Sequence, residues 1–72
     1  TPKTIRGRLL IYLSSQASKA ESTVFQIPFN RQELADYLNL DRSALSKELG
    51  KMRDEGILEF RKSQFVLHQL PE

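Results

Sequence analysis

Four residues in the middle of the chain combine charge and hydrogen-bonding capacity at a spacing that suits contact with DNA bases. They are Arg42, Ser43, Ser46 and Lys47. Successive helical residues rotate by about 100°, so a helix buried around Leu45 would turn Ser43, Ser46 and Lys47 outward. Arg42 would stand at the N-terminal end, where arginine can place two donors on guanine O6 and N7. The pattern predicts a helix that reads base edges in the major groove.

A short preceding helix is predicted to hold this recognition helix in place. It begins after Asn30, whose side chain can accept from the amide three residues on while Glu33 reaches back, as in a capping box. It ends near Leu38. Asn39 follows and tolerates a left-handed backbone conformation, which suits a tight turn between two helices.

The recognition helix itself is predicted over residues 42–55. Asp41 can cap its N-terminus, and Gly56 is the residue type expected just past a helix C-terminus. Its expected buried stripe comprises Leu45, Leu49 and Met52. Gly50 breaks the pattern, because glycine inside a helix costs about 1 kcal/mol relative to alanine. Two interpretations of Gly50 stay open: close approach to DNA or a neighbouring element, and a tolerated surface substitution.

The remaining segments predict a winged helix-turn-helix. Residues 4–19 have helical periodicity, and residues 23–29 alternate as in a short edge strand interrupted by Pro28. Residues 57–61 and 64–68 alternate around Lys62-Ser63 as a β-hairpin. Its expected inward side chains are Leu58, Phe60, Phe65 and Leu67. The predicted fold class is mainly α with a small antiparallel β-sheet (α+β), in one winged-helix domain over residues 1–72.

Composition excludes several other classes of function. The 72 residues contain no cysteine and one histidine, His68, so we expect no disulfide, no metal site and no cofactor in this domain. No apolar run approaches the ~20 residues that span a membrane, and we expect a cytoplasmic protein. No nucleophile–base pair or glycine-rich phosphate loop is present, so we expect no enzymatic activity and no catalytic residues.

Net charge by itself does not indicate a nucleic-acid partner. The formal charge is +2, and within residues 31–62 seven basic side chains balance seven acidic ones. The positions of the charges must therefore carry any prediction of DNA binding. The main alternative, which this balance favours, is a winged helix used as a protein-interaction module without DNA readout.

Five further residues are candidates for contacts with the DNA backbone. Arg31 and Gln32 open the shorter helix, where free amides and the helix dipole favour a phosphate. Lys62 and Ser63 stand at the hairpin turn, and Arg6 lies near the start of the first helix. Such contacts position a protein on DNA without reading its sequence.

The segment FNRQELADYLNLDRSALSKELGKMRDEGIL resembles the DNA-binding domain of the CRP/FNR family of bacterial transcription regulators. The strongest likenesses are RQELA, DRSALS and DEGIL. The resemblance implies that Arg42 reads guanine, that Ser43 contributes to base choice, and that Lys47 contacts bases. It also implies that Arg31 binds a phosphate.

Two departures from the family pattern accompany this resemblance. Asn39 stands where many members have glycine, a change that the turn can accept. Glu48 stands where an apolar residue is common, so we expect different helix packing there.

The resemblance further implies a larger parent protein. Family members carry an N-terminal β-roll effector domain and a long dimerisation helix, and neither is present here. Because the chain starts at Thr1, we expect an excised C-terminal fragment of a homodimer that binds two-fold symmetric double-stranded DNA. Contact with RNA polymerase is left open by these residues, as are the effector and the operator.

Overall fold

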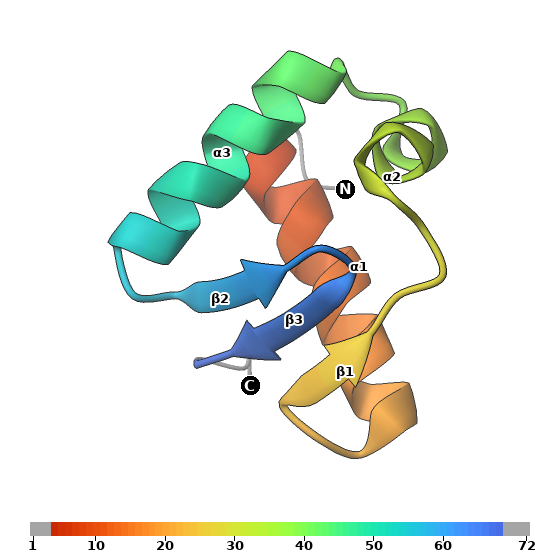
Figure 1. The fold of residues 1–72 in the computed structure, drawn as a ribbon, viewed down its shortest axis with the longest axis vertical. Coiled ribbons are helices and arrows are strands. Elements are labelled where there is room, and N and C mark those ends of the chain that lie inside the picture. Colours follow the sequence, from red (N-terminus) through yellow and green to blue (C-terminus); the bar gives the residue numbers. More distant parts are fainter. Residues whose placement is uncertain (1–3, 69–72) are drawn as a thin grey trace.

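Three helices and a three-stranded antiparallel sheet are formed by residues 4–68, the part of the chain described by this computed structural model (Figure 1). The elements in chain order are α1 (Ile5–Ala20), β1 (Val24–Gln26), α2 (Arg31–Leu38), α3 (Arg42–Asp54), β2 (Leu58–Arg61) and β3 (Gln64–Leu67). This order confirms the predicted winged helix-turn-helix, with the β2–β3 hairpin as the wing.

The capping box predicted for α2 is present. The Glu33 amide donates to Asn30 Oδ1 over 2.8 Å, and the Asn30 amide donates to Glu33 Oε1 over 2.9 Å. Asn39 ends the helix with a φ of 58°, in the left-handed region. The turn between the two helices is therefore built by the side chains that the sequence pattern indicated.

Helix α3 also begins and ends as predicted, to within one residue. Asp41 Oδ2 accepts from the Ala44 amide over 3.1 Å. Glu55 caps the C-terminus, and Gly56 follows with a φ of 78°. Leu45, Leu49 and Met52 are completely buried, which confirms the predicted stripe.

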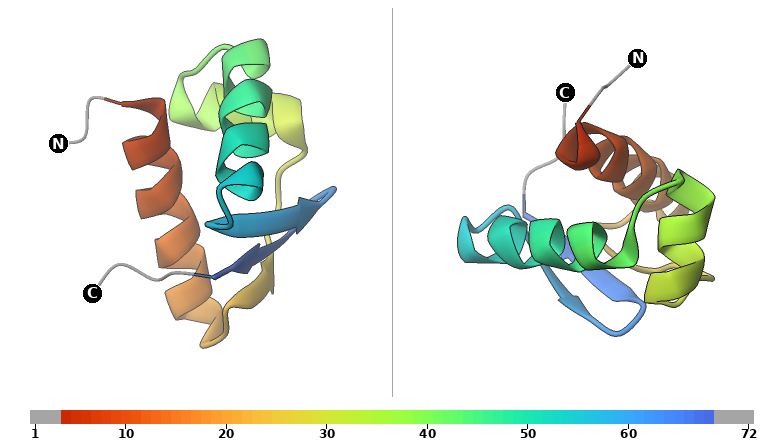
Figure 2. Two further views of the ribbon diagram at one scale, coloured as in Figure 1. Left: turned by 90° about the vertical axis from the view of Figure 1, so that its left-hand side faces the viewer. Right: turned by 90° about the horizontal axis from the view of Figure 1, so that it is seen from above.

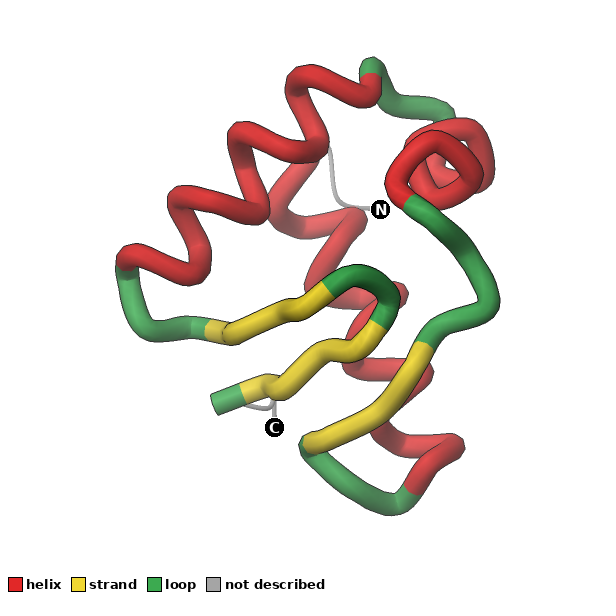
Figure 3. The backbone as a smooth tube through the Cα atoms, viewed as in Figure 1, coloured by secondary structure: helices red, strands yellow, loops and turns green. Residues whose placement is uncertain are grey.

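The sheet has the strand order β1–β3–β2, so β1 lies at an edge (Figure 3). Strand β1 is shorter than predicted and ends at Gln26. The Ile27 amide still donates to the Ser63 carbonyl over 3.0 Å, but Pro28 has no amide hydrogen with which to continue the ladder.

The core lies between the three helices and the inner face of the sheet. Its completely buried large side chains are Leu9, Leu13, Leu34, Leu45, Leu49, Met52, Leu58 and Phe65. Leu58, Phe65 and Leu67 point inward as predicted, whereas Phe60 is only half-buried. Helix α1 and the hairpin tip lie on opposite sides of α3 (Figure 2).

Candidate nucleic-acid interface

The outer side of α3 carries the four residues predicted to contact bases. Arg42, Ser43, Ser46 and Lys47 are all exposed, while Leu45 between them is buried. Their rotation about the helix axis places Arg42 and Ser46 in one row and Ser43 and Lys47 in the neighbouring row. The fold therefore brings them together on one accessible surface, with short side chains beside the two cations.

A groove of about 710 Å³ opens beside the start of α3. Its lining residues come from the start of α2, the start of α3 and the hairpin: Asn30, Arg31, Gln32, Arg42, Phe60, Arg61, Lys62 and Ser63. Four of them are cations and none carries a carboxylate. We call this feature the cationic groove. It joins Arg42 to four of the five residues expected to contact the DNA backbone.

Arg31 is held at the cationic groove by aromatic rings. Its guanidinium carbon lies 5.1 Å from the ring centre of Phe60 and 5.0 Å from that of Phe65. Its Nη1 atom is enclosed and has no hydrogen-bond partner among the described residues. Burial lowers the pKa of Arg31, although an arginine stays charged at neutral pH. The stack thus presents a cation that no carboxylate neutralises.

The hairpin turn is tied to the loop before α2. Ser63 Oγ donates to the Phe29 carbonyl over 2.8 Å. Because a serine hydroxyl has a single hydrogen, this bond uses the donor that we expected to reach a phosphate. Lys62, with a φ of 55°, occupies the left-handed position of the same turn and is exposed. At this turn Lys62 is therefore the exposed cation, and Ser63 links the turn to the loop before α2.

Several of the acidic residues that balance the net charge are engaged in local bonds. Glu33 and Asp41 cap helices, and Asp36 accepts from Gln32. Glu59 lies 2.6 Å from His68 Nε2, at the end of the hairpin away from its turn. Residues 31–62 therefore have equal numbers of cations and carboxylates, but no carboxylate lines the cationic groove.

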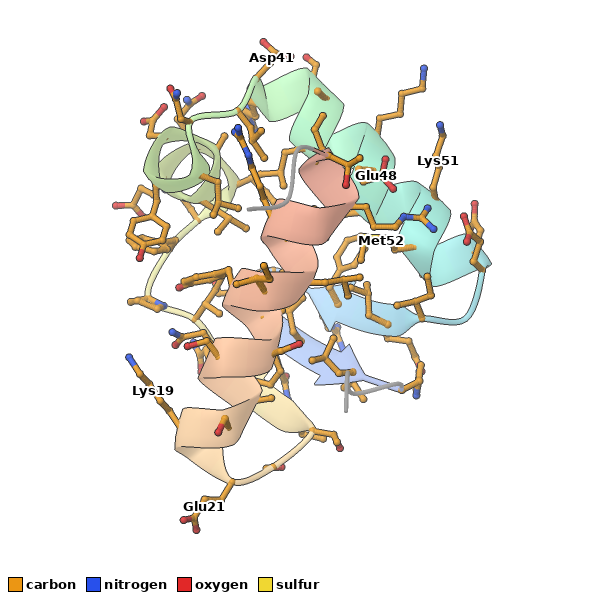
Figure 4. All side chains as sticks on the ribbon, turned by 180° about the vertical axis from the view of Figure 1, so that it is seen from behind. Lys19, Glu21, Asp41, Glu48, Lys51 and Met52 are labelled. Carbon is orange, nitrogen blue, oxygen red and sulfur yellow. The ribbon has the colours of Figure 1, made fainter. Side chains whose placement is uncertain are left out.

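Arg6 does not lie at this interface. Its Nε donates to Glu48 Oε2 over 2.7 Å, and its Nη1 and Nη2 donate to the two Glu55 oxygens over 2.9 and 2.8 Å. Glu48 is on the side of α3 that faces α1 (Figure 4). Three bonds to two carboxylates engage Arg6 within the domain. A phosphate contact by Arg6 stays a prediction, and these bonds argue against it.

Three residues that line the cationic groove are not among the predicted DNA contacts. Arg61 directly precedes the hairpin turn, and strand alternation predicts that it points away from the face that carries Leu58 and Phe60. Asn30 was recognised only as a cap. Phe60 was assigned to the core, and nothing in the sequence shows that Arg31 and Arg53 lie over its ring.

Residues 4–68 lack two features that would indicate other functions. They contain no group of three or more His, Cys, Asp or Glu side chains placed to hold a metal ion. None of the helices there is long and apolar enough to cross a membrane.

Comparison with known proteins agrees with this geometry. The family described as the Crp-like helix-turn-helix domain matches residues 7–72. No curated protein gave a significant match. Helix-turn-helix domains of this type bind DNA in transcription regulation. With nearly all of its residues matched, the chain belongs to the Crp-like helix-turn-helix domain family.

Proposed function

We propose that this domain binds double-stranded DNA sequence-specifically, with α3 in the major groove. The observation that carries the proposal is the cationic groove, which places four cations and no carboxylate beside the N-terminal end of α3. The N-terminal part of a recognition helix is the part that contacts base edges. Phosphates are the groups that such a cluster of cations would attract.

The proposal assigns two kinds of contact to the named residues. Arg42 and Lys47 donate to base edges, with Ser43 and Ser46 able to donate or accept. Phosphate binding falls to Arg31, Arg61 and Lys62, together with Gln32. Contacts of the first kind determine base choice, and those of the second kind determine affinity and register.

The proposal extends to two copies on a two-fold symmetric site. The described residues measure 28 × 25 × 23 Å, less than the ~34 Å of one DNA helical turn. One copy would therefore read one half-site, and two half-sites about one turn apart would take two copies. We expect a single copy to bind weakly, because it lacks the gain from simultaneous engagement of both half-sites.

Selection from a pool of random duplexes at moderate salt tests the proposal. We expect enrichment of a short motif containing guanine. Arg42→Ala should relax the preference at one position, at a cost of about 1–3 kcal/mol for the preferred base. Equal loss of affinity on the selected and random duplexes would contradict the role of Arg42. Binding without a motif and without salt dependence would instead support a protein-interaction module.

A further inference from the structure

Arg6 joins the first turn of α1 to two points on the recognition helix. Its guanidinium makes three hydrogen bonds, one to Glu48 and two to Glu55, with distances of 2.7–2.9 Å. Bidentate pairing of this kind constrains geometry as well as contributing energy. Among residues 4–68, these are the only side-chain hydrogen bonds that join the side chains of two helices.

The two carboxylates are placed to resist rotation of α3. Glu48 and Glu55 are seven residues apart, which is two helical turns, so both leave the same side of the helix. Glu48 directly follows Lys47, and its side chain is only 19% exposed. The guanidinium therefore holds α3 at two positions along its axis, on a side adjacent to the row that carries Ser43 and Lys47.

Small rotations of α3 would matter for base contacts. A helix with its side chains has a radius of roughly 5–6 Å, so a rotation of about 20° moves an outer atom by roughly 2 Å. Hydrogen bonds to base edges tolerate only a few tenths of an ångström. An apolar residue at position 48 would pack without this directional constraint, since hydrophobic contacts are non-directional.

We propose that Arg6 is a positioning residue for base recognition, which fixes the rotation of α3 through its bonds to Glu48 and Glu55. The inference rests on the proposed function and deepens it. Neutralisation of the two glutamates by Arg6 is a different role, because it would change affinity for all DNA sequences alike. Positioning instead changes the ratio of affinities between the preferred site and a site with one altered base.

The test measures that ratio for four proteins: the wild type, Arg6→Met, Glu48→Met and the double variant. Each is titrated with the selected duplex and with a duplex in which the guanine is replaced. Arg8→Met is the matched control, since Arg8 is an exposed arginine of α1 that only donates to the Leu38 carbonyl over 3.3 Å. Thermal unfolding establishes that each variant is folded at the temperature of the titration.

We expect Arg6→Met to reduce the affinity ratio about fivefold, a coupling typical of residues in direct contact. Glu48→Met should reduce it less, because Arg6 keeps its bonds to Glu55. The double variant should match Arg6→Met, which shows that the two residues act through each other. Arg8→Met should leave the ratio unchanged.

Three results would overturn the inference. A folded Arg6→Met with wild-type affinity for both duplexes would show that the bonds serve only stability. Equal weakening on both duplexes, with an unchanged ratio, would show charge neutralisation. If Arg6→Met does not fold, the affinities of the Arg6→Met/Glu48→Met double variant for the two duplexes are compared with those of the wild type instead. The double variant is expected to fold, since an apolar pair can replace an ion pair without loss of stability. Failure of the wild type to select any motif would overturn the proposed function first and this inference with it.

Discussion

At the scale of single residues, the arginines of this domain have three different environments. Carboxylates bind Arg6, aromatic rings stack on Arg31, and Arg42 extends from the start of α3 into an exposed position. Arginine therefore has three roles here: Arg6 joins two helices, Arg31 is a cation held in place by aromatic rings, and Arg42 is a candidate for contact with a base. Residue type and net charge do not distinguish these roles, because the neighbours of each guanidinium determine what it can still bind.

The bonds from Arg6 predict a specific response to acid. They hold the pKa of the Glu55 carboxyl below its usual value. A depressed carboxyl pKa contributes stability that is present above the unfolded-state pKa of about 4.3 and is lost as pH falls through the folded-state value. Thermal unfolding between pH 6 and pH 3 should therefore show a steeper loss of stability below about pH 4.5 for the wild type than for Arg6→Met. Parallel curves would contradict this assignment.

At the scale of the element, α3 has favourable residues at both termini and a residue of low helix propensity, Gly50, in its interior. Asp41 and Gly56 define its termini, and three apolar side chains anchor it to the core. Gly50 lies in its interior. A Cβ built there would meet nothing nearer than Arg53 Nη2, at 4.0 Å. Crowding by a neighbouring element of the described fold therefore does not explain the glycine, and close approach to DNA or a tolerated substitution are the remaining interpretations.

Gly50→Ala separates these two interpretations. We expect the variant to be more stable by about 1 kcal/mol in chemical denaturation, because alanine is the better helix former and the added methyl group has room. Affinity for the selected duplex is the second measurement. A fall in affinity despite higher stability would indicate close approach of the α3 backbone to DNA, and unchanged affinity would indicate a tolerated surface position. Lower stability would contradict the local geometry.

At the scale of the whole molecule, three segments that are distant in sequence meet at one cationic groove. The start of α2, the start of α3 and the hairpin turn each contribute at least one cation. The Ser63–Phe29 bond and the stack of Arg31 on the hairpin phenylalanines hold the wing against the helix-turn-helix. The wing and α2 should therefore engage the DNA backbone as one unit.

Salt dependence measures this joint engagement. If Arg31, Arg61 and Lys62 each neutralise one phosphate, log affinity should fall against log salt with a slope of about −2.7. Arg31→Ala should reduce the slope by about 1 and weaken binding to all sequences alike. A variant that folds and keeps the wild-type slope would show that Arg31 only supports the wing through its aromatic stack.

Local signals in the sequence were sufficient to predict the elements and their order. The Asn30–Glu33 capping box, the left-handed Asn39 and the Asp41 cap all depend on residues within three or four positions of one another, and all are present. The alternation at 57–61 and 64–68 located the hairpin for the same reason. Phe60 is less buried than predicted, because strand alternation indicates which face of the sheet a side chain is on but not how much of that face other residues cover.

The sequence by itself therefore determined the winged helix-turn-helix and the outward direction of Arg42, Ser43, Ser46 and Lys47. Helical and strand periodicities and short-range capping bonds specify both. Only the tertiary structure decided that Arg6 binds Glu48 and Glu55, 42 and 49 residues away, and that Arg61 joins Arg31 and Arg42 at one groove. Long-range pairing depends on how helices and strands pack together, and that packing is invisible in the spacing of residues along the chain.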